Sequence, residues 1–256
     1  MTLRIALAQI PVEHGKPEEN YKKVDQYLSK AAQAKVDVVV LLELWNTGYD
    51  LARLEEIADV EGKRTKEFQD YKVNIVGGSV AIKEHEQFYN TTYIVDKQGK
   101  FISEYRKVHL FRLMDEDKYL AAGNQKNVFE LAGVKSASFI CYDIRFPEWL
   151  RTVAKEKLSV IYVVAQWPQT RIEQWKALLV ARAIENQAYV VAVNRVGDNP
   201  DNKFNGHSLI INPLGEVLSD SGDQETLTVY DLDTSEMEKF TQQIHVFEDR
   251  RPELYD

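Results

Sequence analysis

Two hydrophobic spacings alternate along the N-terminal part of the chain. Apolar residues at every second position over residues 3–7 predict a strand. Apolar residues at helical spacing from Pro17 to Ala31 predict a helix that begins at the proline. The nearly continuous apolar run over 36–42 is typical of a strand buried on both faces. A strand, a helix and a second strand in this order indicate an α/β unit.

The middle of the chain has a different pattern. Strand-like runs at 73–82, 88–95 and 101–105 are separated by the turn segments EHEQ and DKQG, which predicts an antiparallel meander. Gly77 and Gly78 lie inside the first of these runs, and no phosphate-binding loop follows them. The Gly-rich fingerprint of a dinucleotide-binding fold is therefore absent.

Strands and helices alternate again in the second half. Strand-like runs at 158–165 and 188–193 flank a helix predicted over 171–187, and an earlier helix opens at Pro147. A Thr-x-x-Glu pattern that begins at Thr170 predicts a capping box for the helix over 171–187. Two α/β halves predict a layered sandwich of two sheets covered by helices, and a single doubly wound sheet is the competing arrangement.

Composition narrows the class of protein. The 256 residues suit one domain over residues 1–256 with a well-buried core. With 32 basic and 40 acidic residues the net charge is −8, which argues against nucleic acid and anionic membranes as partners. No apolar run approaches the length of a bilayer span, and a single cysteine cannot form an internal disulfide. We therefore predict a cytoplasmic protein.

The single cysteine, Cys141, ends an apolar run just before the helix that opens at Pro147. Free cysteines are most often buried packing residues, so packing is the first interpretation. A strand-to-helix turn, however, lifts a side chain out of the core and leaves N–H groups without partners at the helix entrance. A thiol beside free N–H donors is suited to acyl transfer.

Three kinds of side chain are candidates to assist this thiol. His109 and His207 lie in segments expected near strand ends, so a Cys-His dyad is one alternative. Glu43 follows the buried strand over 36–42, where a carboxylate could accept the thiol proton. Lys107 ends a meander strand and, if it turns inward, would stabilise an oxyanion. A solvent-facing Glu43 and a surface Lys107 are the competing interpretations.

Taken together, these segments resemble the nitrilase superfamily of carbon–nitrogen hydrolases, whose signature is a Glu, a Lys and a Cys in that order. The segments that carry the resemblance are ELWNTGY at 43–49, GGS at 77–79, YRKVHLF at 105–111, CYDIRFPE at 141–148, ARAIENQAYV at 181–190 and GHSLIINPLGEV at 206–217. They cover almost the whole chain. The resemblance implies a four-layer α-β-β-α sandwich.

The resemblance also implies a role for each signature residue. Cys141 is expected to be the nucleophile, Glu43 the general base and later acid, and Lys107 the residue that stabilises the oxyanion. Glu116, which alone would be an unremarkable solvated charge, matches a second glutamate that positions the other groups. The implied reaction is amide hydrolysis through a thioester, with no metal or organic cofactor.

The strings CYDIRFPE and RAIENQAYV are most similar to the ω-amidase branch, whose substrates are small 2-oxo acid ω-amides such as 2-oxoglutaramate. A cation is then needed for the substrate carboxylate. Arg171 is the preferred anchor because helix N-termini favour anions. Arg145 is the second candidate, unless it pairs with Asp143 or Glu148. The candidate pocket walls are aromatic: Tyr49, Tyr142 and Trp167.

Two alternatives remain open at this point. Within the superfamily, the alternative activity is an N-carbamoyl amino acid hydrolase or another small aliphatic amidase. From another class, the alternative is a non-catalytic binding protein that keeps the fold. Members of the superfamily commonly dimerise through helices and C-terminal segments, so we expect a homodimer or higher homo-oligomer. The tail from about 241 to 256 is the expected contact.

Overall fold

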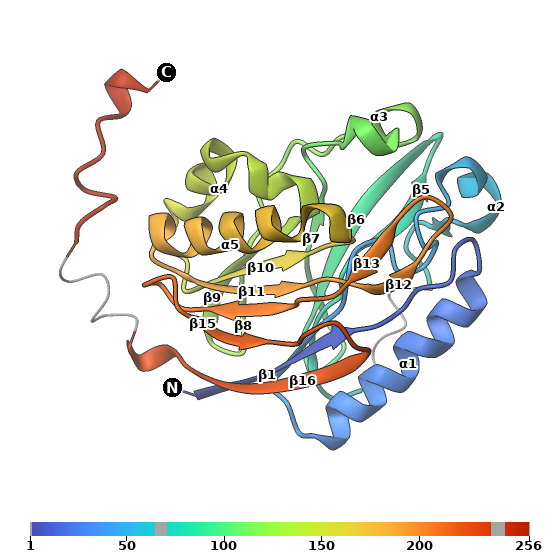
Figure 1. Cartoon of the computed structure of the whole chain (residues 1–256), viewed down its shortest axis with the longest axis horizontal. Helices are drawn as coiled ribbons and strands as arrows, with labels where there is room; N and C mark the ends of the chain where they lie inside the picture. Colours follow the sequence, from blue (N-terminus) through green and yellow to red (C-terminus); the bar gives the residue numbers. More distant parts are fainter. Residues whose placement is uncertain (1, 65–70, 237–243, 256) are drawn as a thin grey trace.

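Two β-sheets that face each other form the centre of the protein (Figure 1). The computed structural model describes residues 2–64, 71–236 and 244–255. Within these ranges the first sheet has the strand order β16-β1-β2-β4-β6-β5-β3, and β7 also pairs with β6. The second sheet has the order β15-β14-β11-β10-β9-β8, and β12 pairs with β13 in a small ribbon.

The elements have the following bounds. The strands of the first sheet are β1 (Thr2–Gln9), β2 (Val38–Val40), β3 (Asp59–Val60), β4 (Asn74–Val76), β5 (Val80–Glu84), β6 (Gln87–Val95), β7 (Phe101–Arg106) and β16 (Thr226–Asp233). Those of the second are β8 (Val128–Leu131), β9 (Val134–Ile140), β10 (Val160–Val164), β11 (Tyr189–Val193), β14 (Leu209–Ile211) and β15 (Val217–Asp220), and the ribbon is β12 (Val196–Asp198) and β13 (Lys203–Asn205). The helices are α1 (Pro17–Gln33), α2 (Leu54–Ile57), α3 (Glu116–Tyr119), α4 (Pro147–Ala154) and α5 (Ile172–Asn186).

Helices cover the outer face of each sheet. Figure 1 shows α4 and α5 over the second sheet and α1 over the first, on the opposite side of the molecule. The order of layers is therefore helix, sheet, sheet, helix. This arrangement confirms the predicted four-layer α-β-β-α sandwich, and the single doubly wound sheet is wrong.

The hydrophobic pattern accounts for these layers. Strands β2, β10 and β11 are buried along their whole length, as expected for parallel strands between a helix layer and a second sheet. Helix α1 starts at Pro17, as predicted, and turns Val24, Leu28 and Ala31 into the core. At about 25 cal/mol per Å² of apolar area, such side chains supply most of the folding free energy.

The predicted single strand over 73–82 is wrong, because the chain breaks between β4 and β5. Both pieces pair with β6, but Gly77 and Gly78 lie in the gap rather than inside a strand. Gly78 has a φ of +61°, and a Cβ there would lie 2.1 Å from the Leu42 carbonyl oxygen. The break brings Ser79 against the turn that follows β2, where its backbone N–H donates to the same oxygen at 2.9 Å.

The predicted capping box at Thr170 is also wrong. Thr170 lies in a 3₁₀ turn over Gln169–Arg171, and α5 begins directly after this turn, at Ile172. Its N-cap is Arg171, and no side chain caps the helix. Backbone hydrogen bonds of the turn satisfy some of the N–H groups at the helix start. For example, the Arg171 N–H donates to the Pro168 oxygen at 3.0 Å. The helix itself and the strand that follows it, β11, lie where the sequence predicts them.

In the described ranges, no helix combines the length and the apolar character that crossing a bilayer requires.

Candidate active site

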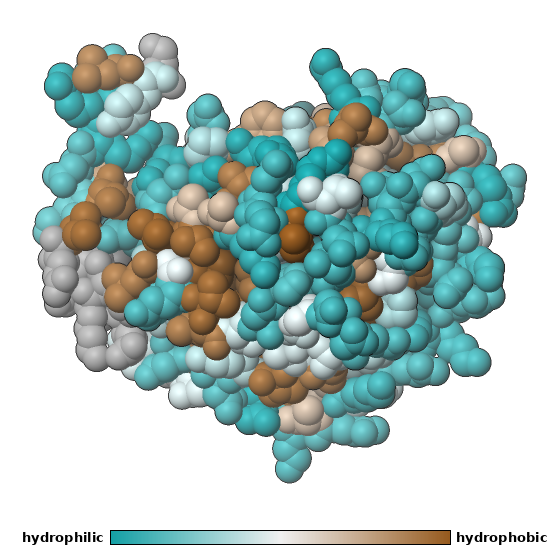
Figure 2. Space-filling model, in the orientation of Figure 1, coloured by the Kyte–Doolittle hydropathy of each residue, from teal (hydrophilic) through white to brown (hydrophobic). Residues whose placement is uncertain are grey.

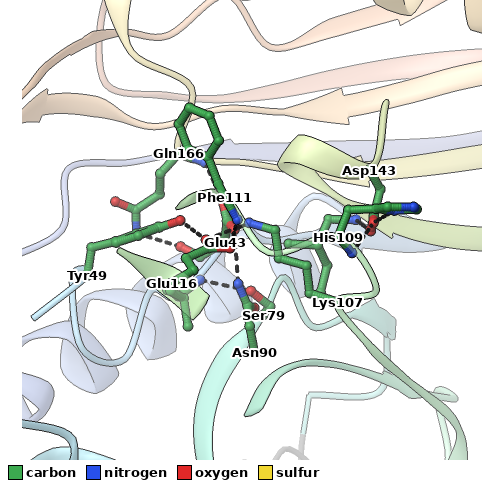
Figure 3. A network of polar contacts seen from close by, with 12 residues as sticks. Glu43, Tyr49, Ser79, Asn90, Lys107, His109, Phe111, Glu116, Asp143 and Gln166 are labelled. Atoms are coloured by element: carbon green, nitrogen blue, oxygen red, sulfur yellow. Dashed lines mark hydrogen bonds and ion pairs between the residues drawn. The ribbon is translucent and has the colours of Figure 1, made fainter. Parts of the chain in front are cut away.

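Four of the predicted site residues meet where strands end at the interface between the two sheets. Figure 3 shows three of them, Glu43, Lys107 and Glu116. Glu43 follows β2, Lys107 follows β7, Cys141 follows β9, and Glu116 begins α3. Glu43, Lys107 and Glu116 are 0% exposed and Cys141 is 6% exposed. The solvated interpretations of Glu43, Lys107 and Glu116 are therefore wrong. We call these four residues the buried cluster.

Lys107 joins the two carboxylates of the buried cluster. Its Nζ donates to Glu43 Oε1 at 2.7 Å and to Glu116 Oε1 at 2.6 Å. Burial by itself lowers the pKa of this ammonium, but the negative charges of Glu116 and Glu43 outweigh burial and raise the pKa above its ordinary value. Lys107 is therefore a fixed cation at neutral pH.

Glu43 has a hydrogen-bond partner on each carboxylate oxygen. Oε1 accepts from Asn90 Nδ2 at 2.9 Å, in addition to Lys107, and Oε2 accepts from the Gln166 backbone N–H at 2.9 Å. Ser79 holds the turn beyond it, because its Oγ accepts from the Leu44 backbone N–H at 2.9 Å. The carboxylate is thus held from both sheets, by β6 of the first and by the end of β10 in the second.

Glu116 completes the arrangement around Lys107. Its Oε1 also accepts from the Tyr49 hydroxyl, and its Oε2 accepts from the Phe111 backbone N–H at 2.7 Å. Burial raises the pKa of Glu116, while the nearby ammonium of Lys107 opposes that rise. Burial and the charge of Glu116 also raise the pKa of the Tyr49 hydroxyl, so Tyr49 acts here as a donor.

Cys141 lies in a strained turn beside Glu43. It follows β9 directly with a φ of +45°, a conformation that a non-glycine residue rarely adopts. Burial and the charge of Glu43 raise the pKa of the Cys141 thiol well above the ordinary value, and Lys107 only partly opposes them. At rest the thiol is therefore protonated and next to a carboxylate that can accept its proton.

Asp143 and Arg182 hold this turn in place. Asp143 is fully buried, and its Oδ2 accepts from the Ile140 backbone N–H at 3.0 Å and from the Tyr105 hydroxyl at 2.8 Å. Arg182, on α5, donates from Nε to the Ile144 oxygen at 2.8 Å. Both contacts fix the backbone on either side of the cysteine. A strained φ persists only where its surroundings hold it in this way.

The two candidate histidines have other partners. His109 directs Nδ1 to Asp143 Oδ1 at 2.8 Å, and its ring stacks on Phe146 with centroids 3.7 Å apart. His207 directs Nδ1 to Asp220 at 2.9 Å. The geometry therefore favours a carboxylate, not a histidine, as the group that takes the thiol proton.

A small pocket opens onto the thiol. Its lining residues are Phe111, Met114, Cys141, Tyr142, Arg145, Gln166, Trp167, Pro168 and Arg171. Both predicted carboxylate anchors and two of the three predicted aromatic walls are therefore present. Tyr49 does not line the pocket, and its hydroxyl is directed at Glu116.

Each pocket arginine lies over an aromatic ring. The Arg145 guanidinium is 5.0 Å from the Trp167 ring centroid, and that of Arg171 is 5.8 Å from the Phe111 ring centroid. Arg145 also donates to Gln174 Oε1, so the alternative in which it pairs with Asp143 or Glu148 is wrong. Neither guanidinium has a carboxylate partner within the described ranges, which leaves both able to receive an anionic ligand.

Residues around Glu43 are the ones that sequence reasoning missed. Ser79, Asn90 and Gln166 are polar, at most 1% exposed, and contact Glu43 or its turn. No catalytic motif surrounds Asn90 or Gln166 in the sequence. Ser79 lies in the GGS segment that resembles the family, but the resemblance implied no role for it. Among the described residues, no group of three or more His, Cys, Asp or Glu side chains is arranged to hold a metal ion.

Comparison with known proteins identifies the family of the chain. The sequence profile of the carbon-nitrogen hydrolase family matches residues 4–242. The chain belongs to this family, which confirms the resemblance inferred from the sequence.

Three relatives are informative. The chain is 48% identical to the 2-oxoglutaramate amidase of Bacillus subtilis (strain 168), with all of both chains covered. It shares 27% identity and a TM-score of 0.91 with the carbon-nitrogen hydrolase superfamily protein XC1258 of Xanthomonas campestris, covering 98% of each chain. A mutant of the amidase from Nesterenkonia sp. AN1 has 25% identity and a TM-score of 0.87, covering 99% of this chain and 95% of that one. Its structure contains the acetamide moiety of fluoroacetamide added covalently to the active-site cysteine.

Proposed function

We propose that this protein is an amidase that hydrolyses the terminal amide of small 2-oxo acid ω-amides, such as 2-oxoglutaramate, to the dicarboxylate and ammonia. The observation that carries the proposal is the geometry of the buried cluster, in which Lys107 Nζ lies 2.7 Å from Glu43 Oε1 and 2.6 Å from Glu116 Oε1, with Cys141 beside these charges. The similarity to a 2-oxoglutaramate amidase supports the substrate class.

Acylation begins with the transfer of the thiol proton. Glu43 takes the proton from Cys141 as Sγ attacks the amide carbon, and the carbonyl oxygen becomes an oxyanion. Lys107 and the Tyr142 backbone N–H stabilise that oxyanion. Glu43 then gives its proton to the amide nitrogen, the carbon–nitrogen bond breaks, ammonia leaves, and a thioester on Cys141 remains.

Deacylation uses the same carboxylate for water. Glu43 takes a proton from water as the oxygen attacks the thioester carbon, and a second oxyanion forms at the same donors. The carbon–sulfur bond then breaks, and Glu43 returns its proton to the departing Sγ. The product is a carboxylic acid, and the buried cluster is restored. Glu116 contributes by holding Lys107 in place through the 2.6 Å contact.

Two arginines supply the selectivity for an acidic substrate. Arg171 and Arg145 line the pocket beside Cys141, and Trp167 and Phe111 hold their guanidinium groups by ring contact. A guanidinium binds a carboxylate through two parallel hydrogen bonds. We assign Arg171 to the substrate carboxylate, with Arg145 as the second cation.

The test is ammonia release from 2-oxoglutaramate by the wild type and by Cys141→Ala and Glu43→Gln. We expect each substitution to reduce turnover by at least about 10³-fold, since nucleophile and base act as a unit. Circular dichroism controls for folding. Turnover by folded Cys141→Ala would exclude the thioester route. Carbon dioxide released together with ammonia from an N-carbamoyl amino acid, with no turnover of 2-oxoglutaramate, would instead support the alternative activity.

We further propose that the chain works as one domain in a cytoplasmic homodimer. A nucleophilic thiol is preserved in a compartment that keeps cysteines reduced, which supports the cytoplasm. Apolar side chains that favour self-association are exposed near the C-terminal tail, and Figure 2 shows an apolar area on that side of the molecule. The exposed fractions are 48% for Ile184, 59% for Leu214 and 61% for Ile244. Part of the predicted tail contact, residues 241–243 and 256, lies outside the described residues.

A further inference from the structure

Gln166 connects the carboxylate-bearing residue Glu43 to the second sheet. Its backbone N–H donates to Glu43 Oε2 at 2.9 Å, and its side-chain Nε2 donates to the Glu43 backbone oxygen at 2.6 Å. Gln166 follows β10 and is 1% exposed, and Figure 3 shows its side chain beside Glu43. One residue thus holds both the backbone and the carboxylate of Glu43.

Arg195 determines which way the Gln166 amide faces. Its Nη1 donates to Gln166 Oε1 at 2.8 Å. Because a guanidinium can only donate, the amide oxygen must face Arg195, and the amide nitrogen must face Glu43. Without Arg195, the amide could rotate and present its oxygen to the Glu43 carbonyl, which is repulsive.

The surroundings of Arg195 are unusual for a charged residue. It is 0% exposed, and within the described ranges all its hydrogen-bond acceptors are uncharged: Gln166 Oε1 and the backbone oxygens of Val12, Val196 and Asp198. Burial lowers the pKa of Arg195 to about 10, against the opposing charges of Asp198 and Glu13, so it stays protonated at neutral pH. A buried cation without an ion pair is costly.

We propose that Gln166 and Arg195 are positioning residues for Glu43, in which Arg195 orients the Gln166 amide and that amide fixes the Glu43 backbone, so that the carboxylate stays beside Cys141. The inference rests on the proposed role of Glu43 as the base. The placement supports it, because Arg195 also donates to the Val12 oxygen at 2.8 Å and so ties the chain beyond β1 to the ends of β10 and β11. A purely structural role would need only contacts between the sheets, not a fixed amide orientation at Glu43.

The experiment compares Gln166→Leu, Arg195→Met and the double variant, with active sites counted by titration. The readouts are kcat and KM for ammonia release from 2-oxoglutaramate and the rate of Cys141 alkylation by iodoacetamide at neutral pH. We expect each single variant to lower kcat by about 10- to 100-fold, with KM changed by less than about threefold. Alkylation should slow in parallel. The double variant should match Gln166→Leu within about threefold, because Arg195 acts through Gln166.

A matched control is Asn74→Leu. Asn74 is another buried amide, whose Nδ2 donates to the Asp37 oxygen at 2.6 Å and whose Oδ1 accepts from the Lys97 backbone N–H at 3.0 Å, away from the buried cluster. It should lose thermal stability but keep kcat within about twofold. If Gln166→Leu or Arg195→Met does not fold, Gln166→Glu and Arg195→Lys take their places. Gln166→Glu keeps an acceptor for Arg195 but removes the side-chain donor to the Glu43 backbone oxygen.

The outcomes separate this inference from the proposed function. Unchanged kcat and alkylation in the folded single variants, while Cys141→Ala and Glu43→Gln are inactive, would overturn only the role of Gln166 and Arg195. Additive losses in the double variant would also overturn it, since Arg195 would then act independently of Gln166. Turnover by Cys141→Ala would overturn the proposed function itself.

Discussion

At the scale of single residues, the buried cluster keeps a proton rather than releasing it. Glu43 and Glu116 share the cation of Lys107, so the cluster already carries an excess negative charge when the Cys141 thiol is neutral. Loss of the thiol proton to solvent would add another buried anion, which burial makes costly. Transfer of that proton to Glu43 leaves the total charge unchanged. The raised thiol pKa and an adjacent acceptor are therefore compatible with nucleophilic attack.

We expect Lys107, the cation of the buried cluster, to make a large contribution to the free energy of unfolding of the protein. We predict that Lys107→Met lowers the free energy of unfolding at neutral pH by about 3–5 kcal/mol, because two buried carboxylates lose their counter-ion. Burial already raises the pKa of Glu116, and removal of Lys107 raises it further. A carboxyl whose folded-state pKa is raised favours the folded state at low pH and loses that contribution as pH rises. Urea unfolding should therefore show a larger loss at pH 8 than at pH 5.

Lys83→Met is the control for this prediction. Lys83 pairs with Glu55 at 2.5 Å, but the lysine side chain is 25% exposed and the glutamate side chain is 68% exposed. Such a surface pair contributes no more than about 1 kcal/mol. An equal loss in both variants, or a loss in Lys107→Met that does not depend on pH, would contradict the argument from buried charge.

The sequence identified the members of the buried cluster but not the residues that hold them. Glu43, Lys107, Glu116 and Cys141 each lie at the end or start of an element, and resemblance gave them roles. The contact between Gln166 and Glu43 joins residues 123 apart in sequence across two sheets. Periodicity predicts which face a residue occupies, but it does not predict how two sheets align. No local pattern could therefore have shown this contact.

At the scale of elements, the break between β4 and β5 shapes the turn that carries Glu43. We predict that Gly78→Ala destabilises the protein by about 3 kcal/mol or more and lowers kcat. A φ of +61° costs a residue with a Cβ about 1–2 kcal/mol, and the Cβ would also lie 2.1 Å from the Leu42 backbone oxygen. The backbone beside Glu43 must shift to relieve that contact. Urea unfolding and ammonia release measure the two effects.

Gly222→Ala separates the two causes. Gly222 has a φ of +67°, yet nothing lies within 4 Å of the position its Cβ would take. It should therefore lose only about 1–2 kcal/mol and keep its kcat. If both variants behave alike, the left-handed backbone and not the contact with Leu42 explains the loss.

The two errors in predicting elements have different physical origins. The run over 73–82 has the residue types of one strand, and its break depends on the Leu42 oxygen of a different strand end. Thr170 and Glu173 have capping-box spacing, but the chain satisfies that helix start with the 3₁₀ turn over Gln169–Arg171. At the strand break a tertiary contact overrides the local pattern, and at the helix start a competing local turn does so. Where packing and pattern agree, as for α1 and α5, the sequence predicts the element closely.

At the scale of the whole molecule, the hydrophobic runs predicted the layers because burial is averaged over many residues. Strands such as β10 and β11 are apolar along their length and can lie only between two covering layers. The C-terminal segment is an exception to this burial of apolar side chains. Figure 1 shows the C-terminal segment at the edge of the sandwich, where Phe247 packs against the core. Three of its apolar side chains, Ile244, Leu254 and Tyr255, are among the most exposed of the described residues.

The C-terminal segment, residues 244–255, presents these apolar side chains to a partner in the proposed homodimer. Leu254 and Tyr255 are 62% and 58% exposed, and in that dimer a second copy covers them. We predict that Leu254→Asp combined with Tyr255→Asp converts the dimer to a monomer, because charges in an interface core are unfavourable. A stable interface also needs about 800 Å² per partner, which the variant would lose in part.

Light scattering coupled to gel filtration should show half the wild-type mass. Val60→Asp, at a side chain 52% exposed on β3, should leave the mass unchanged. A wild-type monomer would exclude the proposed dimer, and a variant that stays dimeric would place the interface elsewhere.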